Sequence, residues 1–182
     1  SSPASPFSVQ KFYDALRSQG IPVGKDTVHA YLGHLEDAFL VRTVSLYTAS
    51  ERQRMVNPRK AYPVDPGLIA VFERSGRANL GRALETAVLI ELERRGADVH
   101  YVRTPSGYEV DFHAQLPDRS TWLLQVCTAV EEPATLAREV RALEEAATHY
   151  PAATPLLLTL EALSPAVTLP PETRPKGYAF DN

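Results

Sequence analysis

The chain has 182 residues, of which 44% are hydrophobic and 8% aromatic, enough for packed cores in one large domain or two small ones. A single cysteine excludes a disulfide framework and indicates a reducing compartment, so we expect a cytoplasmic protein. No apolar run approaches the ~20 residues of a membrane helix. No signal-peptide pattern opens the sequence, and we expect no membrane partner.

The charge is unevenly distributed. The net charge of −3 gives no sign of a nucleic-acid-binding protein. However, residues 1–60 carry eight Lys/Arg against five Asp/Glu, whereas residues 61–182 carry eleven against seventeen. Phosphate contacts are therefore expected in the first third of the chain.

Two amphipathic helices are predicted near the start. The first covers residues 9–18, and the second follows the turn IPVGK, with Asp26 or Thr27 as its N-cap. Helix, short glycine-containing turn and helix is the helix-turn-helix unit. The apolar stripe of the second helix, which is expected to face the core, consists of Val28, Tyr31, Leu32, Leu35, Ala38 and Phe39.

A β-hairpin is predicted after these helices. Its strands cover residues 41–47 and 60–64, and the polar residues 48–57 join them. A short helix over residues 66–72 follows, capped by the aspartate before it. Residues 1–74 are therefore expected to form a winged helix-turn-helix domain, in which the hairpin is the wing.

The predicted wing gathers positive charge, with four cationic residues in nine positions. Such a patch is suited to contacts with a DNA backbone, which depend on charge and not on base sequence. The outward residues of the second helix are poorly suited to reading bases. Any DNA contacts are therefore expected at Arg52, Arg54, Arg59 and Lys60. Winged helices also serve as protein-docking modules, and that alternative stays open.

Residues 75–182 are predicted to form a second domain of mixed α/β structure. It begins with a helix over GRALETAVLIELERR, which Gly96 is expected to end as a left-handed C′ residue. Glu85 lies on the apolar stripe of this helix, three and four residues before Val88 and Leu89. A carboxylate that faces a core costs several kcal/mol unless it is paired, so Glu85 needs a partner.

Strands are predicted over residues 108–116 and 122–127, followed by a helix over 134–147 and a buried strand over 155–160. Alternation in the first strand gives one face made of Tyr108, Val110, Phe112 and Ala114, and another made of Glu109, Asp111 and His113. In the second strand, Leu123, Gln125 and Cys127 share a face. A helix carboxylate and oxygen side chains on two strands are able to converge on one hard cation.

This order of elements resembles the PD-(D/E)XK, or restriction-endonuclease-like, superfamily, whose αβββαβ core surrounds a mixed sheet. The superfamily carries a glutamate on the first helix, an aspartate on the second strand and an E-x-K pair on the third. By that resemblance Glu85, Asp111, Gln125 and Cys127 occupy the catalytic positions, and Glu85, Asp111 and Gln125 would hold Mg²⁺. Cys127 replaces the lysine, and losing such a cation typically lowers rates ~10²-fold or more, so we expect weak or absent cleavage.

Five segments resemble the uncharacterised C-terminal region of many prokaryotic AAA-type ATPases. They are LEDAFLV, KAYPVDPGL, GRALETAVLIEL, YVRTPSGYEVDF and LLQVC, in that order. The resemblance implies a winged helix followed by a nuclease-like domain, with an upstream ATPase module as partner. The chain itself contains no GxxxxGK[ST] or GxGxxG motif for binding phosphates.

Each candidate site residue also has a structural interpretation. Glu85 would pair with an arginine such as Arg82 or Arg103, and Asp111 would be an ordinary solvent-face residue. Gln125 would bond a neighbouring backbone, and Cys127 would be a small buried hydrophobe. The corresponding function is non-enzymatic, namely a regulatory or docking domain, and the acidic charge of residues 61–182 favours it.

Overall fold

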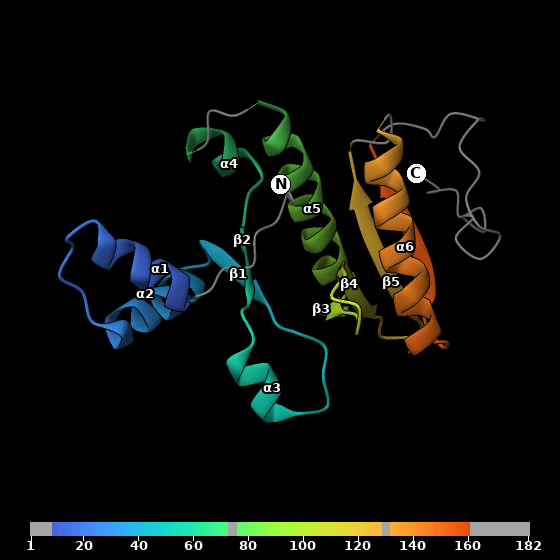
Figure 1. Cartoon of the computed structure of the whole chain (residues 1–182), viewed down its shortest axis with the longest axis horizontal. Coiled ribbons are helices and arrows are strands. Elements are labelled where there is room, and N and C mark those ends of the chain that lie inside the picture. The colour runs from blue at the N-terminus through green and yellow to red at the C-terminus, as the bar shows by residue number, and fades with distance from the viewer. Residues whose placement is uncertain (1–8, 73–75, 129–131, 161–182) are drawn as a thin grey trace. The chain divides into compact units, whose positions relative to one another are not determined.

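The computed structural model describes residues 9–72, 76–128 and 132–160 and has a mixed α/β architecture with two sheets (Figure 1). The chain divides into two compact units, residues 1–90 and 91–182. This division falls inside helix α5 (Gly76–Arg94), whereas the boundary predicted from the sequence lies before that helix.

The first unit opens with the two predicted helices and the predicted hairpin. Helix α1 (Val9–Ser18) packs against α2 (Lys25–Asp37), which also contacts strand β1 (Val41–Val44). β1 pairs antiparallel with β2 (Lys60–Pro63) in the register that places Val44 opposite Lys60. Both strands are shorter than predicted.

The apolar stripe of α2 is largely exposed, contrary to the prediction that it faces a core. Val28 is buried, whereas Tyr31, Leu35 and Phe39 are 61%, 41% and 74% exposed. Helix α1 and strand β1 contact α2, whose Leu32 is half-buried, and the remaining residues of the stripe are exposed within the described residues.

Helix α2 ends on a residue in the left-handed region. Phe39 has a φ of 54°, and the amides of Phe39 and Leu40 donate to the carbonyls of Glu36 and Leu35 at 3.0 and 2.9 Å. Glycine usually occupies this position, because an L side chain raises the energy of the conformation by roughly 1–2 kcal/mol. The strain therefore coincides with an exposed aromatic side chain.

Two short helices flank β2. The connection between the hairpin strands, for which only polar character was predicted, contains helix α3 (Glu51–Val56). Ser50 Oγ caps this helix by accepting from the Gln53 amide at 3.3 Å. Helix α4 (Gly67–Phe72) was predicted, and Asp65 Oδ1 accepts from the Gly67 amide at 2.7 Å. Six-residue helices depend on such caps, because they form few hydrogen bonds within the helix. They are also too short to show a helical period in the sequence.

Helix α5 begins at Gly76, five residues before the predicted start at Gly81. Its end agrees with the sequence. Gly96 has a φ of 74°, and the amides of Gly96 and Ala97 donate to the carbonyls of Glu93 and Leu92 at 2.8 and 3.0 Å. These two bonds form a Schellman termination.

The second unit contains the mixed sheet that the sequence predicted. Strands β3 (Asp98–Arg103), β4 (Glu109–Gln115) and β5 (Thr121–Cys127) form an antiparallel meander. After helix α6 (Pro133–His149), strand β6 (Thr154–Thr159) joins β5 in parallel, giving the order β3-β4-β5-β6. Helix α6 runs along the sheet (Figure 1), and its Leu136, Leu143 and Ala146 bury their side chains with Leu123 and Leu157.

A bulge interrupts the alternation of β4. His100 lies opposite His113 and Val102 opposite Val110, so β4 has one more residue than β3 in this interval. The predicted alternation, which placed His113 on the face of Asp111, is therefore wrong beyond the bulge. Three consecutive residues of β4 are buried, namely Phe112, His113 and Ala114.

The helices of the described residues include none whose length and apolar character would let it cross a membrane.

Candidate functional site

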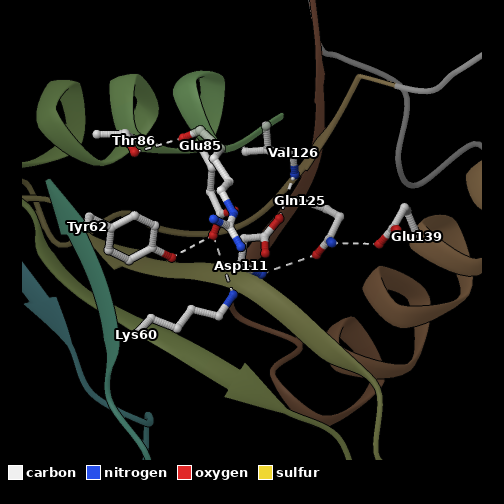
Figure 2. Close-up of polar contacts among 9 residues, drawn as sticks. Lys60, Tyr62, Glu85, Thr86, Asp111, Gln125, Val126 and Glu139 are labelled. Carbon is white, nitrogen blue, oxygen red and sulfur yellow. Dashed lines mark hydrogen bonds and ion pairs between the residues drawn. The ribbon is translucent and has the colours of Figure 1, made fainter. Parts of the chain in front are cut away.

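Glu85 is buried and bonded by two side chains of β2. Figure 2 shows Lys60 and Tyr62, two residues apart on the strand, both directed towards the Glu85 carboxylate. Tyr62 Oη donates to Glu85 Oε1 at 2.6 Å, and Lys60 Nζ lies 3.5 Å from the same oxygen. All three are within a few per cent of full burial, at 1% exposed for Lys60 and Glu85 and 3% for Tyr62. The need for a partner was predicted, but these two partners were not.

The environment of Lys60 departs from its predicted role. The sequence places it in a solvent-exposed basic patch, yet the hairpin register directs its side chain into the unit interior. A buried ammonium bonded to a buried carboxylate does not present its charge to a phosphate.

The three arginines of the predicted patch remain at the surface. Arg52 on α3 and Arg59 before β2 are exposed. Arg54 is partly buried, and its guanidinium already has partners in the protein. Its Nη2 donates to the Thr48 carbonyl at 3.0 Å, and its Nη1 lies 3.5 Å from Glu51 Oε1. Arg52 and Arg59 are thus the residues best placed to contact an anion.

Strands β4 and β5 separate at the other predicted site residues. Their backbone pairing extends only to Phe112 and Leu124. Beyond it, side chains replace the ladder: Gln125 Oε1 accepts from the Asp111 amide at 3.1 Å, and Asp111 Oδ2 accepts from the Val126 amide at 3.0 Å. The structure therefore brings Asp111 and Gln125 together at a fork between the strands.

Glu139 of α6 completes this arrangement, and the sequence reasoning missed it. Gln125 Nε2 donates to Glu139 Oε2 at 2.7 Å, so Gln125 lies between Asp111 and Glu139 (Figure 2). The other carboxylate oxygen accepts from the Arg138 guanidinium, whose Nε is 3.2 Å away. A signal was present: Glu139 lies three residues after Leu136 and four before Leu143, on the apolar face of its helix.

Cys127 is buried among apolar side chains that include Leu136 and Leu143 of α6. This environment agrees with the interpretation of Cys127 as a small buried hydrophobe. An electrostatic interaction with the thiol contributes to raising the pKa of Arg138, after the larger contribution of Glu139.

Two histidines meet on β3 and β4. His113 is buried opposite His100, and its ring lies edge-on to Tyr150, with 5.7 Å between the ring centroids. Burial lowers the pKa of His113 below its usual value, and His100 lowers it further. His100 Nε2 in turn lies 3.4 Å from Asp98 Oδ2.

Each of the predicted Mg²⁺ ligands already accepts a hydrogen bond from another group of the protein. Glu85 Oε1 already accepts from Tyr62 beside the Lys60 ammonium, which would repel a divalent cation. Asp111 Oδ2 and Gln125 Oε1 accept from backbone amides. No group of three or more His, Cys, Asp or Glu side chains able to hold a metal ion occurs among the described residues. Glu85 belongs to the first unit and the strand residues to the second, so their convergence stays a prediction.

The comparisons with known proteins give relatives without an assigned function. A family model described as "Domain of unknown function (DUF8612)" matches residues 3–78. An uncharacterised protein of Methanocaldococcus jannaschii is 29% identical over 147 residues, covering 79% of this chain and 32% of the relative. An uncharacterised protein of Haemophilus influenzae is 33% identical over 123 residues, covering 68% of this chain and 30% of the relative. No solved structure gives a significant match. The chain is thus similar to about a third of the length of each of these proteins.

Proposed function

We propose that this chain is a nucleic-acid-associated module with a degenerate nuclease site, whose cleavage activity is weak or absent. It consists of a winged helix and a PD-(D/E)XK-like core. By the resemblance of its five segments, it serves as an accessory region of an AAA-type ATPase.

The fork in the second unit carries the proposal. The element order and the parallel addition of β6 agree with an αβββαβ core. At the positions of the E-x-K pair, an amide bonded to Glu139 replaces the acid, and a buried thiol replaces the lysine. A neutral amide and a neutral thiol supply neither the charge that holds a metal ion nor the cation that stabilises a developing phosphorane charge. The arrangement therefore favours a binding module over a cutting one.

The exposed arginines of the first unit supply the contact with nucleic acid. Arg52 and Arg59 lie on and next to a protruding connection between β1 and β2 (Figure 1). Their charge is accessible and is suited to phosphate contacts that do not depend on sequence.

A binding assay tests the proposal. Fluorescence anisotropy with duplexes of unrelated sequence should give similar affinities, which fall steeply as salt rises between about 50 and 200 mM. Arg52→Glu/Arg59→Glu should weaken binding to every duplex and flatten the salt dependence. Plasmid relaxation in Mg²⁺ should stay at background for the wild-type chain. Robust cleavage, or binding that ignores salt, would reject the proposal.

A second candidate function is a non-enzymatic docking domain, and the exposed stripe of α2 favours it. Tyr31, Leu35 and Phe39 present apolar surface that a monomeric module usually covers. Absence of nucleic-acid binding together with retained folding would leave this candidate as the better one.

A further inference from the structure

We propose that the exposed stripe of α2 binds the same stripe of a second copy of this chain. The stripe consists of Tyr31, Leu35 and Phe39. In the pair, the two α2 helices lie antiparallel about a two-fold axis next to Leu35. This inference goes beyond the proposed function, and it does not require that the chain binds nucleic acid.

The helices at the start of the first unit bury little apolar surface. Among the described residues, seven of the nine large hydrophobic side chains that are exposed lie within residues 12–47. By contrast, the hydrophobic residues buried in that interval are Val28 and Val44. A pair of short helices gains most of its stability by packing its apolar side, so this distribution indicates a missing partner.

The spacing of the stripe is self-complementary. Tyr31 lies four residues before Leu35 and Phe39 lies four residues after it, so an aromatic residue stands on either side of a central leucine. A two-fold axis beside Leu35 superimposes this pattern on itself in the antiparallel direction. Leu35 then meets Leu35 of the second copy, and Tyr31 meets Phe39 of the second copy. The interface therefore contains two aromatic pairs around one aliphatic contact, and aromatic rings attract one another in such pairs.

The backbone at Phe39 is held in a strained conformation. Its φ of 54° lies in the left-handed region, and the bonds from the Phe39 and Leu40 amides to helix carbonyls fix it there. Strain of this kind persists where the surrounding structure imposes it, and it often coincides with function. Here it fixes an exposed aromatic residue just beyond the last turn of α2, where the proposed pair brings Tyr31 of the second copy.

The surface beside the stripe carries no Lys, Arg, Asp or Glu. With about 100° of rotation per residue, the helical positions next to Tyr31 and Leu35 on the same side are Thr27, His34 and Ala38. The charged residues of α2 lie more than a quarter turn away from the centre of the stripe. An uncharged surface of this kind suits an apolar counterpart, and an antiparallel pair also sets the two helix dipoles in opposite directions.

Two other occupants fit these features less well. A helix that binds a membrane surface usually has several Lys/Arg residues beside its apolar face, whereas α2 contains one, Lys25. A nucleic acid needs cations, which the surface beside the stripe lacks. A different protein would need a matching pattern of its own, whereas a second copy of this chain carries that pattern by symmetry.

The exposed apolar area is close to what a modest dimer requires. At about 200 Å² for each large apolar side chain, the exposed parts of the seven side chains within residues 12–47 amount to roughly 700 Å². Standard interfaces bury about 800 Å² on each partner. Because a second copy covers only part of this surface, we expect a concentration-dependent dimer with a dissociation constant on the order of 10 µM.

Sedimentation velocity of the full chain tests the inference, at concentrations from about 1 to 300 µM and without nucleic acid. The average mass should rise from that of one chain towards that of two chains and level off there. Leu35→Glu places two carboxylates at the axis, so it should weaken dimerisation on the order of 100-fold and leave the chain largely monomeric. Leu160→Glu is the matched control, because Leu160 is an exposed leucine outside these helices, and this variant should dimerise as the wild type does.

Cross-linking with a short bismaleimide tests the antiparallel arrangement. Residues at a two-fold axis meet their own copies, so Leu35→Cys should cross-link to itself. Tyr31→Cys should instead cross-link to Phe39→Cys in a mixture of the two variants, and poorly to itself. The wild-type chain is the blank, because its one thiol, Cys127, is buried.

A wild-type chain that stays monomeric at about 300 µM would overturn the inference and leave the stripe to a different protein. The same holds if Leu35→Glu dimerises as the wild type does, or if Leu160→Glu loses dimerisation equally, since either result places the interface elsewhere. Self-cross-linking of Tyr31→Cys in preference to the mixed product would refute the antiparallel arrangement. Should Leu35→Glu be unfolded by circular dichroism, Tyr31→Glu, at a more exposed position, should still prevent dimerisation.

Discussion

Removal of the Tyr62 hydroxyl is expected to destabilise the first unit, because that hydroxyl bonds a buried carboxylate. Tyr62→Phe keeps the ring that packs in the interior but deletes the 2.6 Å bond to Glu85 Oε1. Hydrogen bonds to charged groups contribute about 1.5–3 kcal/mol to stability. This bond is buried away from water, so its contribution should lie in the upper part of that range. We therefore expect a loss of about 2–3 kcal/mol in the free energy of unfolding.

The ion pair between Lys60 and Glu85 indicates how much stability the loss of the Glu85 carboxylate should cost. At the 3.5 Å that separates Lys60 Nζ from Glu85 Oε1, the attraction is about 5 kcal/mol for an effective dielectric constant of about 20. Desolvation of both groups offsets most of this attraction. Glu85→Gln, however, leaves the ammonium buried without its carboxylate, and such a change typically costs 3–5 kcal/mol. It should therefore be more harmful than Tyr62→Phe.

A double-mutant cycle identifies the interaction. Urea unfolding should be followed by far-ultraviolet circular dichroism, because the single tryptophan, Trp122, lies on β5 in the second unit and would not report the first. The double variant Tyr62→Phe/Glu85→Gln should lose less than the sum of the two single losses, since Tyr62→Phe deletes the bond and Glu85→Gln removes the charge that strengthens it. Tyr31→Phe is the control, because it deletes a hydroxyl from a tyrosine that is 61% exposed. A loss in Tyr62→Phe no larger than in the control, or fully additive losses, would show that Glu85 is not held as a carboxylate by this hydroxyl.

Three further predictions concern the second unit and the end of α2. Cys127→Lys should raise Mg²⁺- or Mn²⁺-dependent plasmid relaxation above the wild-type level. It should also destabilise the fold by about 1–3 kcal/mol, because a lysine stem must leave a buried position. If the variant is inactive and no metal shifts its melting curve, the fork is purely structural. The folded-state pKa of His113 is lowered, first by burial and then by His100, so the unfolded chain takes up the proton first and stability should fall as the pH drops below about 6.5. In the variant His113→Gln, which keeps Asp98 and Tyr150, the free energy of unfolding measured with urea should depend less on pH. An unchanged pH profile would contradict the attribution of this dependence to His113. Phe39→Gly should raise the melting temperature, because glycine adopts the φ of 54° without the roughly 1 kcal/mol of strain, and a lower value would mean that the exposed ring contributes packing.

Those parts of the fold that depend on local patterns were predictable. The helical period of α5 and α6, the glycine that ends α5 and the existence of strands β4 and β5 are specified by neighbouring residues. The same is true of the apolar run that becomes β6. Short-range sequence patterns specify such elements because a helix or strand must bury one side wherever the chain places it.

The contacts that decide the candidate site were not predictable in this way. Glu85 needed a partner, but the choice of Lys60 and Tyr62 depends on the hairpin register of a strand more than twenty residues earlier. The bulge that buries His113 adds one residue to β4, and no glycine or proline marks its position in the sequence. Glu139 lies on the apolar face of α6 as Glu85 lies on that of α5, so the same criterion applies to both residues.

The hydrogen bonds at the fork between β4 and β5 give Asp111 and Gln125 a structural role that is independent of catalysis. The Asp111 carboxylate and the Gln125 amide satisfy the Val126 and Asp111 amides at the point where the backbone ladder stops. A substitution that removes either side chain leaves a peptide group of the sheet unsatisfied, whether or not the chain has any chemistry to perform. Selection for a stable sheet alone would therefore be enough to preserve the aspartate and the glutamine in a relative. If a relative retained both residues, that retention by itself would be a sign of folding and not of catalysis.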